Sequence, residues 1–220
     1  MISLENVVKT YQTRKGDVNA LSNISLRINK AEFVVICGPS GSGKTTLLMT
    51  VAGMLRPTSG VVSIEQNNLY AMSIRARAKF RAQNIGFVFQ MFHLVPYLNA
   101  AENIVLAGVA VTSKNRKART HDLIKKFGLV GRSYHRPYEL SAGEKQRTAI
   151  ARALLNRPKI ILADKPTGNL DPDNATSVLG YLSDFHRSGG TVILATHGPT
   201  AERFADRIIY LRNGIADNSG

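Results

Sequence analysis

Cysteine, acidic side chains and long apolar runs are all scarce in this sequence of 220 residues. Its single cysteine, Cys37, excludes an internal disulfide framework. A membrane helix needs roughly 20 apolar residues, and the longest apolar stretch, NIVLAGVAV (103–111), is about half that length. The N-terminal sequence MISLENVVKTY has no charged-then-apolar leader, so we expect a cytoplasmic protein.

The shortage of acidic residues leaves the chain strongly basic. Only 15 aspartates and glutamates oppose 29 lysines and arginines, and the formal net charge is +14. Such an excess favours an acidic partner: a nucleotide, a nucleic acid or the anionic surface of a membrane. Much of it lies in RARAKFRAQ (75–83) and KNRKARTHDLIKK (114–126). Both segments are typical of helices, and we expect their basic faces to be solvated rather than to form a nucleic-acid patch.

The apolar pattern predicts an α/β fold with a mostly parallel sheet, because short β-branched runs alternate with helical patterns. The expected buried strands are FVVIC (33–37), IGFVF (85–89), KIILAD (159–164) and TVILAT (191–196). ISLENVV and ALSNISLRI alternate as half-exposed antiparallel strands do, which predicts an additional β lobe.

The domain organisation follows from where the strand patterns stop. Between residues 91 and 140 helix signals dominate, and we find neither internal repeats nor a long linker. We therefore expect one domain over residues 1–220, with a core formed by 1–90 and 141–220 and a helical subdomain in 91–140.

The segment GPSGSGKTT (38–46) lies directly between the strand FVVIC and the helical pattern TLLMTVAGML. This strand, loop and helix order is the context of a phosphate-binding loop, whose glycines let backbone N–H groups wrap the phosphates of ATP. Lys44 is expected to reach the β- and γ-phosphates, and the Thr45 hydroxyl to ligate Mg²⁺. The expected nucleotide-binding residues are Gly38, Ser40, Gly41, Ser42, Gly43, Lys44, Thr45 and Thr46. Cys37, beside the loop, is expected to be a small buried residue rather than a reactive thiol.

A second segment, LSAGEKQRTAIARAL (140–154), resembles the LSGGQ signature of the ATP-binding cassette (ABC) family, with Ala142 in place of the usual glycine. The resemblance implies that Ser141 and Gly143 hold the γ-phosphate at a helix N-terminus. The same residues also predict an ordinary N-cap, with Ser141 as the cap and Glu144 completing a capping box. The two roles are compatible.

The remaining motifs resemble the same family in their order, and they imply further site residues. Tyr11 matches the residue that stacks on adenine, and Gln90 the glutamine that senses Mg²⁺ and links to the membrane partner. Asp164 matches the Walker B carboxylate that holds Mg²⁺ through water. Asp171 ends the D-loop sequence NLD, and His197 matches the switch histidine.

Within the family, PTSGVVSI, IGFVFQMFHLVPYLNAAENI, RPYELSAGEKQRTAIARAL and PTGNLD are most similar to ATPases of the lipoprotein-release, macrolide-export and cell-division group. The resemblance implies an α/β P-loop NTPase core with a β lobe and a helical subdomain. It also implies a homodimer in the ATP-bound state. That dimer would serve a separate integral membrane subunit at the inner face of the cell membrane.

Lys165 departs from the family pattern, in which a glutamate follows the Walker B aspartate and polarises the attacking water. A lysine is protonated at neutral pH and accepts no proton. Losing a general base costs about 10²- to 10⁴-fold in rate, so we expect ATP binding to survive and hydrolysis to be impaired.

Two alternatives stay open. One is a nucleic-acid ATPase of the same superfamily, which is disfavoured because Gln90 and Ser141 are only 51 positions apart. That interval leaves no room for the coiled coil or zinc module that such proteins insert. The other alternative, kept open by Lys165, is an ATP-binding regulator that does not hydrolyse ATP.

Overall fold

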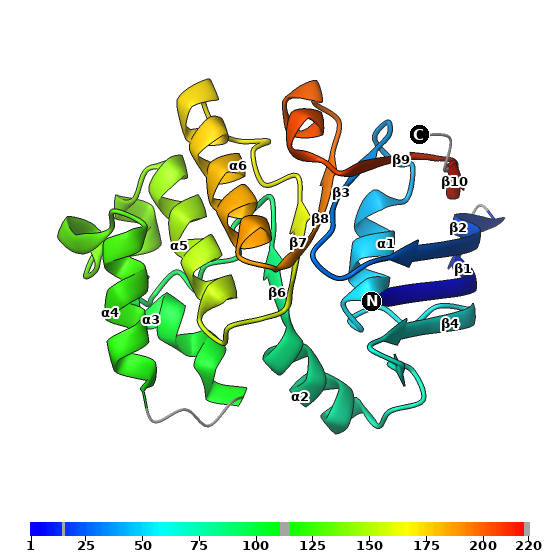
Figure 1. The fold of residues 1–220 in the computed structure, drawn as a ribbon, viewed down its shortest axis with the longest axis horizontal. Helices are drawn as coiled ribbons and strands as arrows, with labels where there is room; N and C mark the ends of the chain where they lie inside the picture. Colours follow the sequence, from blue (N-terminus) through cyan, green and yellow to red (C-terminus); the bar gives the residue numbers. More distant parts are fainter. Residues whose placement is uncertain (15, 111–114, 218–220) are drawn as a thin grey trace.

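The computed structural model describes residues 1–14, 16–110 and 115–217, and it contains two sheets (Figure 1). The first sheet has the order β2-β1-β4-β5, with antiparallel pairing throughout. Its strands are β1 (Ile2–Thr13), β2 (Gly16–Ile28), β4 (Ser59–Ile64) and β5 (Asn67–Asn68). Ile2 pairs with Ile28 and Leu4 with Leu26, and all four side chains are buried. The predicted antiparallel β lobe is confirmed.

The second sheet has the order β10-β9-β3-β8-β7-β6 and is parallel except for the β9–β10 pair. The four predicted strands are confirmed as β3 (Phe33–Cys37), β6 (Ile85–Val88), β7 (Ile160–Asp164) and β8 (Thr191–Thr196). Every residue of these strands is buried, as expected for parallel strands covered on both faces. The other two strands are β9 (Arg207–Arg212) and β10 (Ile215–Asp217), which the sequence patterns did not single out.

Helices cover the parallel sheet. They are α1 (Lys44–Val51), α2 (Ile74–Asn84), α3 (Ala100–Leu106), α4 (Arg116–Lys126), α5 (Ala142–Leu154) and α6 (Pro172–Arg187). Short 3₁₀ turns are η1 (Ala107–Ala110), η2 (Val130–Arg132), η3 (Pro137–Glu139) and η4 (Pro199–Phe204). In Figure 1, α3, α4 and α5 group on the side of the sheet away from the β lobe. No described residue from 91 to 140 lies in a strand, but the boundaries of a separate subdomain stay a prediction.

The two faces of β3 serve two different halves of the core. Val34 and Ile36 pack with α1 and the β lobe, whereas Phe33, Val35 and Cys37 pack with α5 and α6. This division follows from the strand itself, because successive side chains point to opposite faces of a sheet. The carboxyl ends of β3, β7 and β8 therefore emerge between two packed layers.

The predicted helices in both basic segments are confirmed over their described residues; residue 114 lies outside those. The expectation that their basic faces are solvated is only partly right. In α2, the Arg77 guanidinium lies 5.0 Å from the centre of the Tyr70 ring, and Arg81 donates to the Gly53 carbonyl at 3.4 Å. In α4, Arg119 donates to the carbonyls of Leu155 and Leu154 at 2.7 and 2.9 Å. These arginines contact the rest of the fold instead of solvent alone. Arg119 also places a cation at the C-terminus of α5, which is favourable.

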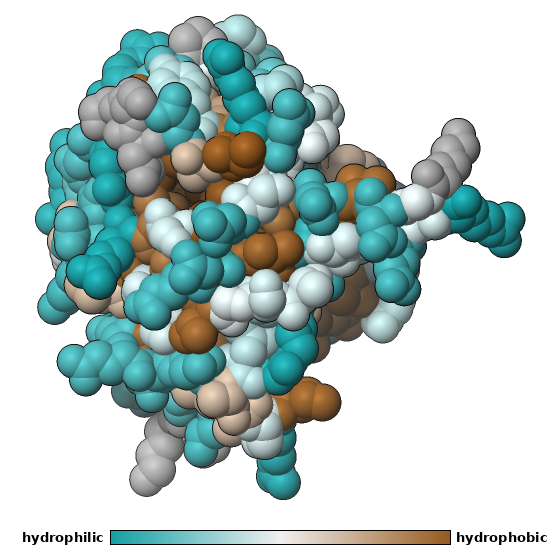
Figure 2. Space-filling model, turned by 90° about the vertical axis from the view of Figure 1, so that its right-hand side faces the viewer, coloured by the Kyte–Doolittle hydropathy of each residue, from teal (hydrophilic) through white to brown (hydrophobic). Residues whose placement is uncertain are grey.

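The surface on the β-lobe side is mixed in character. Figure 2 shows it as mainly hydrophilic, with apolar residues in small separate patches. Exposed apolar residues include Val18, Val61 and Ile215. Within the described ranges, no helix is both long and apolar enough to cross a bilayer.

Candidate ATP-binding site

The phosphate-binding loop joins β3 to α1, as predicted. Gly43 caps α1 with a φ of 103°, and a side chain there would collide with the Ala20 carbonyl, so the backbone requires glycine. The Lys44 side chain is buried and lies along the loop. Its Nζ donates to the carbonyls of Gly38 and Pro39 at 2.6 and 2.7 Å. An ammonium held by neutral carbonyls in this way is free to exchange them for phosphate oxygens.

Thr45 and Asp164 form the second element of the site. The Thr45 hydroxyl donates to Asp164 Oδ2 at 2.7 Å, joining the start of α1 to the end of β7. Asp164 is buried, and its Oδ1 has no hydrogen-bond partner in the described part of the chain. A buried carboxylate oxygen without a partner is costly, and oxygen atoms are the ligands that Mg²⁺ prefers. The two residues therefore fit a Mg²⁺ ion.

Gln90 follows β6 and is half-buried. Its side-chain amide lies against Gly168, in the loop that follows Lys165, and its backbone carbonyl accepts from Asn169 Nδ2 at 3.2 Å. Among the described residues, no hydrogen bond joins the Gln90 amide to Thr45 or Asp164. Its role as a metal-sensing residue stays a prediction.

Lys165 lies in the phosphate-loop pocket itself. It lines a cavity of about 150 Å³ together with Ala20 and residues 41–46. Its backbone has a φ of 44°, and its N–H donates to the Ala195 carbonyl at 2.8 Å, which fixes the residue beside β8. Burial lowers the pKa of Lys44, and the positive charge of Lys165 lowers it further, against the opposing effect of Asp164. Two cations thus share one small pocket, an arrangement that a polyphosphate would relieve.

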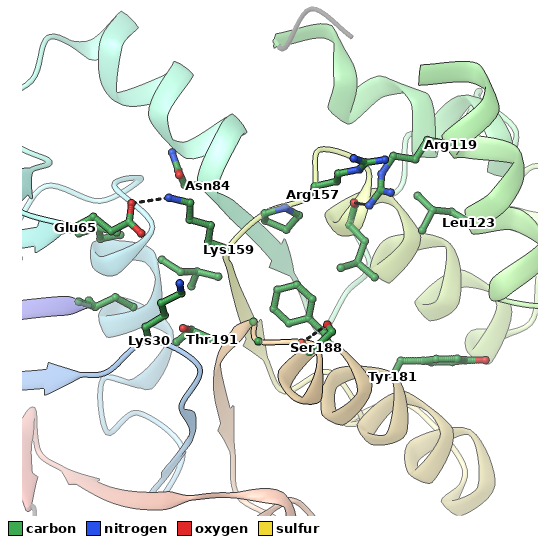
Figure 3. Close-up of a pocket in the computed structure, with 18 of the residues that line it drawn as sticks. Lys30, Glu65, Asn84, Arg119, Leu123, Arg157, Lys159, Tyr181, Ser188 and Thr191 are labelled. Carbon is green, nitrogen blue, oxygen red and sulfur yellow. Dashed lines mark hydrogen bonds and ion pairs between the residues drawn. The ribbon is translucent and has the colours of Figure 1, made fainter. Parts of the chain in front are cut away.

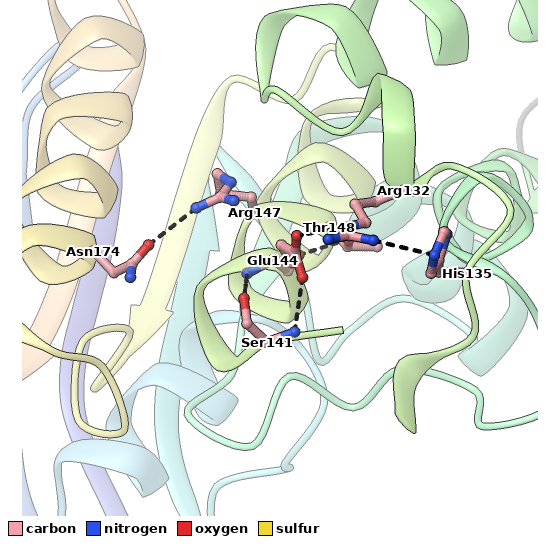
Figure 4. Close-up of polar contacts among 7 residues, drawn as sticks. All are labelled: Arg132, His135, Ser141, Glu144, Arg147, Thr148 and Asn174. Carbon is pink, nitrogen blue, oxygen red and sulfur yellow. Dashed lines mark hydrogen bonds and ion pairs between the residues drawn. The ribbon is translucent and has the colours of Figure 1, made fainter. Parts of the chain in front are cut away.

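The signature segment begins α5 with the predicted capping box, which the structure confirms (Figure 4). Ser141 Oγ accepts from the Glu144 N–H at 3.2 Å, and Glu144 Oε2 accepts from the Ser141 N–H at 2.8 Å. That backbone hydrogen bond is the main cause that lowers the pKa of Glu144, and Arg132, at 3.0 Å from Glu144 Oε1, also lowers it. The N-terminus of α5 is therefore rigidly shaped by its own side chains.

Asp171 is the N-cap of α6 and belongs to a chain of hydrogen bonds that connects α6 to α5. Its Oδ1 accepts from the Asn174 N–H at 2.9 Å, and Asn174 Oδ1 accepts from Arg147 Nη1 at 3.0 Å. Gly143 packs directly beneath the Asn174 side chain. Sequence reasoning missed Asn174 and Arg147, because neither stands out in a motif.

The other predicted site residues lie outside the lining of the phosphate-loop pocket. Tyr11 is on β1, 40% exposed, with Lys9 Nζ 5.2 Å from its ring centre. His197 is exposed and follows β8. The pocket unites Gly41, Ser42, Gly43, Lys44, Thr45, Thr46 and Lys165, but it is not lined by Gly38, Ser40, Ser141, Gly143 or Asp171. Ala20 lines it and was missed, since a lone alanine in a strand gives no signal.

The prediction that Cys37 is a small buried residue is confirmed. It is 6% exposed, and its Sγ lies 3.4 Å from Glu202 Oε1. Burial, together with the hydrogen bond to Glu202, raises the pKa of the thiol to about 11.

Comparison with known proteins agrees with this geometry. The sequence profile of the ABC transporter family matches residues 21–168. The ABC transporter ATP-binding protein YvrO of Bacillus subtilis, itself uncharacterized, is 43% identical, with 100% of this chain and 98% of that protein covered. The lipoprotein-releasing system ATP-binding protein LolD 2 of Caulobacter vibrioides is 39% identical, with 97% and 95% covered. The macrolide export ATP-binding/permease protein MacB 2 of Aeromonas hydrophila is 40% identical, but only 34% of that protein is covered.

Solved structures give the same result. A dimeric structure of the ATP-binding cassette MJ0796, in a post-hydrolysis state bound to ADP and Pi, matches with a TM-score of 0.91 at 39% identity. The match covers 99% of this chain and 98% of that one. The fold and the phosphate-binding loop thus define a nucleotide-binding cassette. The chain belongs to the ABC transporter family, as an ATP-binding ATPase subunit of a transporter.

Proposed function

We propose that this subunit binds Mg²⁺-ATP, dimerises with a second copy around the nucleotide and powers a separate integral membrane subunit from the cytoplasmic side. The similarity to a lipoprotein-releasing ATP-binding protein over nearly its whole length supports a separate membrane partner. A longer relative is named as a macrolide export protein, which makes export a related process. The dimeric state of the matching cassette structures supports the homodimer.

Binding of the nucleotide uses residues that are already positioned. Lys44 exchanges the Gly38 and Pro39 carbonyls for the β- and γ-phosphate oxygens, and the N-terminus of α1 supplies backbone N–H groups. Thr45 and Asp164 would hold Mg²⁺, which offsets the phosphate charge when bound. Ser141 and Gly143 of the second copy would complete the γ-phosphate contacts, and Tyr11 would stack on the adenine.

Hydrolysis is impaired in this proposal, and the observation that carries it is Lys165 in the lining of the phosphate-loop pocket. A protonated amine there supplies positive charge to the phosphates but takes no proton from the attacking water. Gln90 carries no basic group, and His197, which does, is exposed and lies outside the lining of the phosphate-loop pocket. The subunit therefore binds ATP well and turns it over slowly.

The test is ATP turnover by the unchanged protein beside Lys165→Glu, each with its membrane partner. A rise of at least about 100-fold is expected for Lys165→Glu, because a general base returns to its place. Lys165→Gln is the matched control, since it removes the cation without adding a base, and it should stay slow.

A second candidate function is an ATP-binding regulator that does not hydrolyse ATP, and Lys165 itself favours it. The same experiment separates the two. If Lys165→Glu binds ATP and dimerises but hydrolyses no faster, the missing base does not limit the chain. Either His197 or another group then supplies the catalysis, or, where the unchanged protein also shows no turnover, the regulator is the better description.

A further inference from the structure

A second, larger cavity lies at the opposite end of the parallel sheet from the ATP site, and the proposed mechanism does not use it. Its volume is about 500 Å³. Ile160 and Thr191, the first residues of β7 and β8, line it, whereas Asp164 at the other end of β7 belongs to the ATP site. Figure 3 shows Lys30 and Lys159 on one side of the cavity and Arg119 and Arg157 on the other.

The lining of this cavity is strongly basic. Five basic side chains, those of Lys30, Arg119, Lys126, Arg157 and Lys159, face only two acidic ones, Glu65 and Asp122. Lys159 forms an ion pair with Glu65 at 2.7 Å. Over the described residues, Lys30, Lys126 and Arg157 form no ion pair with a carboxylate. The cavity therefore holds uncompensated positive charge.

Two of these cations lie close together. In Figure 3 the guanidinium groups of Arg119 and Arg157 are neighbours. Burial is the main cause that lowers the pKa of Arg119, and the charge of Arg157 lowers it further. Arg157 has a φ of 52°, as residues that follow a helix C-terminus often do, and its N–H donates to the Leu154 carbonyl at the end of α5.

The floor of the cavity is apolar. Leu123, Leu154 and Ile160 are buried there, and the half-buried rings of Tyr181 and Phe185 contribute from α6. Aromatic and aliphatic walls with a few convergent charged groups, in a cavity of this size, are typical of small-molecule sites. Neither feature alone indicates a ligand, but the two together indicate an amphipathic one.

Helix capping accounts for only part of the basic lining. Arg119 caps the C-terminus of α5 through the carbonyls of Leu154 and Leu155. Lys30 and Arg157 lie on loops. The Arg157 backbone N–H donates to the Leu154 carbonyl at 3.1 Å, but among the described residues neither side chain donates a hydrogen bond to a helix carbonyl. Their side chains are therefore available to a ligand.

We propose that this cavity binds a small organic phosphate, with an apolar body on the floor and its phosphate groups between Arg157 and Lys30. Guanidinium groups suit this role because they bind phosphate oxygens through paired N–H donors. The site is distinct from the ATP site and needs neither the dimer nor hydrolysis.

The test is calorimetric titration of the full chain with geranyl diphosphate, in the presence of saturating Mg²⁺-ATP so that the phosphate-binding loop is occupied. We expect saturable binding that is at least tenfold tighter than that of pyrophosphate, which carries the charge alone, or geraniol, which carries the apolar body alone. Equal affinity for pyrophosphate would overturn the role of the apolar floor.

Variants locate the binding. Arg157→Glu and Lys30→Glu should each weaken it at least tenfold, and Lys117→Glu, which reverses an exposed charge on α4 outside the cavity, should leave it unchanged. Arg157→Gly removes the same charge while relaxing the backbone, so it tests the site even if charge reversal disturbs folding. Unchanged affinity in Arg157→Gly, or no binding of geranyl diphosphate to the unchanged protein, would refute the proposal. ATP affinity, measured separately, reports on the ATP site alone.

Discussion

The contact between the signature glycine and α6 makes a sharp stability prediction. A Cβ added at Gly143 would lie 2.6 Å from Asn174 Cγ and closer still to its Oδ1. Asn174 has little freedom to yield, because it bonds to Arg147 Nη1 at 3.0 Å and to Asp171 Oδ2 at 2.6 Å. Gly143→Ala must therefore strain α5 against α6 and disrupt the bond between Arg147 and Asn174.

The size of the effect follows from these two contributions. Overpacking costs about 1–3 kcal/mol, and loss of the hydrogen bond to Arg147 adds about 1 kcal/mol. The better helix propensity of alanine returns up to about 1 kcal/mol. The net loss in the free energy of unfolding is about 2 kcal/mol, which for a domain of this size lowers Tm by about 4–8 °C.

Thermal and denaturant unfolding of four variants measure this. The matched control is Gly180→Ala, a glycine within α6 with no atom within 4 Å of an added Cβ, which should be stabilised by about 0.5–1 kcal/mol. Asn174→Ala removes the obstructing side chain, so adding Gly143→Ala to it should cost almost nothing further. If Gly143→Ala costs as much in the Asn174→Ala background as alone, steric conflict with Asn174 is not the cause.

Three further predictions concern the ATP site and its surroundings. Lys44→Ala should severely weaken Mg²⁺-ATP binding in calorimetry, because it removes the cation that reaches the β- and γ-phosphates; unchanged affinity would show that the site is misplaced. ATP should promote a dimer in light scattering that Ser141→Arg prevents, and a dimer that persists in this variant would contradict the sandwich arrangement. The Cys37 thiol, with its pKa raised from 9.0 to about 11, should react with a maleimide far more slowly in the folded than in the denatured protein. Because the thiol is held protonated in the folded protein, it contributes to the free energy of unfolding below pH 9, and this contribution should decline as pH rises from about 9 to about 11. Rapid labelling of the folded protein at pH 8 would contradict the expected slow reaction.

The sequence predicted those parts of the molecule whose signals are local. Strands β3, β7 and β8 are buried on both faces and therefore appear as continuous apolar runs. The capping box of Ser141 and Glu144 spans only four residues. Strand β9 was missed because its ends are arginines and its burial alternates, so its pairing with β3 depends on residues far away in the chain.

Long-range partners also explain why the basic segments were only partly understood. Arg119 donates to carbonyls 35 and 36 positions away, and Arg77 packs on a tyrosine that precedes its own helix. A charge run gives no sign of which of its members find such partners. The basic cavity is a further example, because its five cations come from α4 and from two loops, which meet only in the folded chain.

Lys165 shows the same limit at the ATP site, and its position changes the expected balance of effects. From sequence, the lysine is both a missing base and a cation at a position where the family has an anion. The structure adds that Lys165 lines the same 150 Å³ pocket as Lys44, which the sequence did not show. In the proposed function the two effects act on different quantities: the missing base would slow turnover, whereas the added cation would strengthen the binding of ATP. Slow turnover and tight binding of ATP would together favour the ATP-bound closed dimer if, as the family resemblance implies, hydrolysis is the step that separates the two copies. A subunit of this kind would hold its membrane partner in the ATP-bound state for longer than one with a glutamate at position 165.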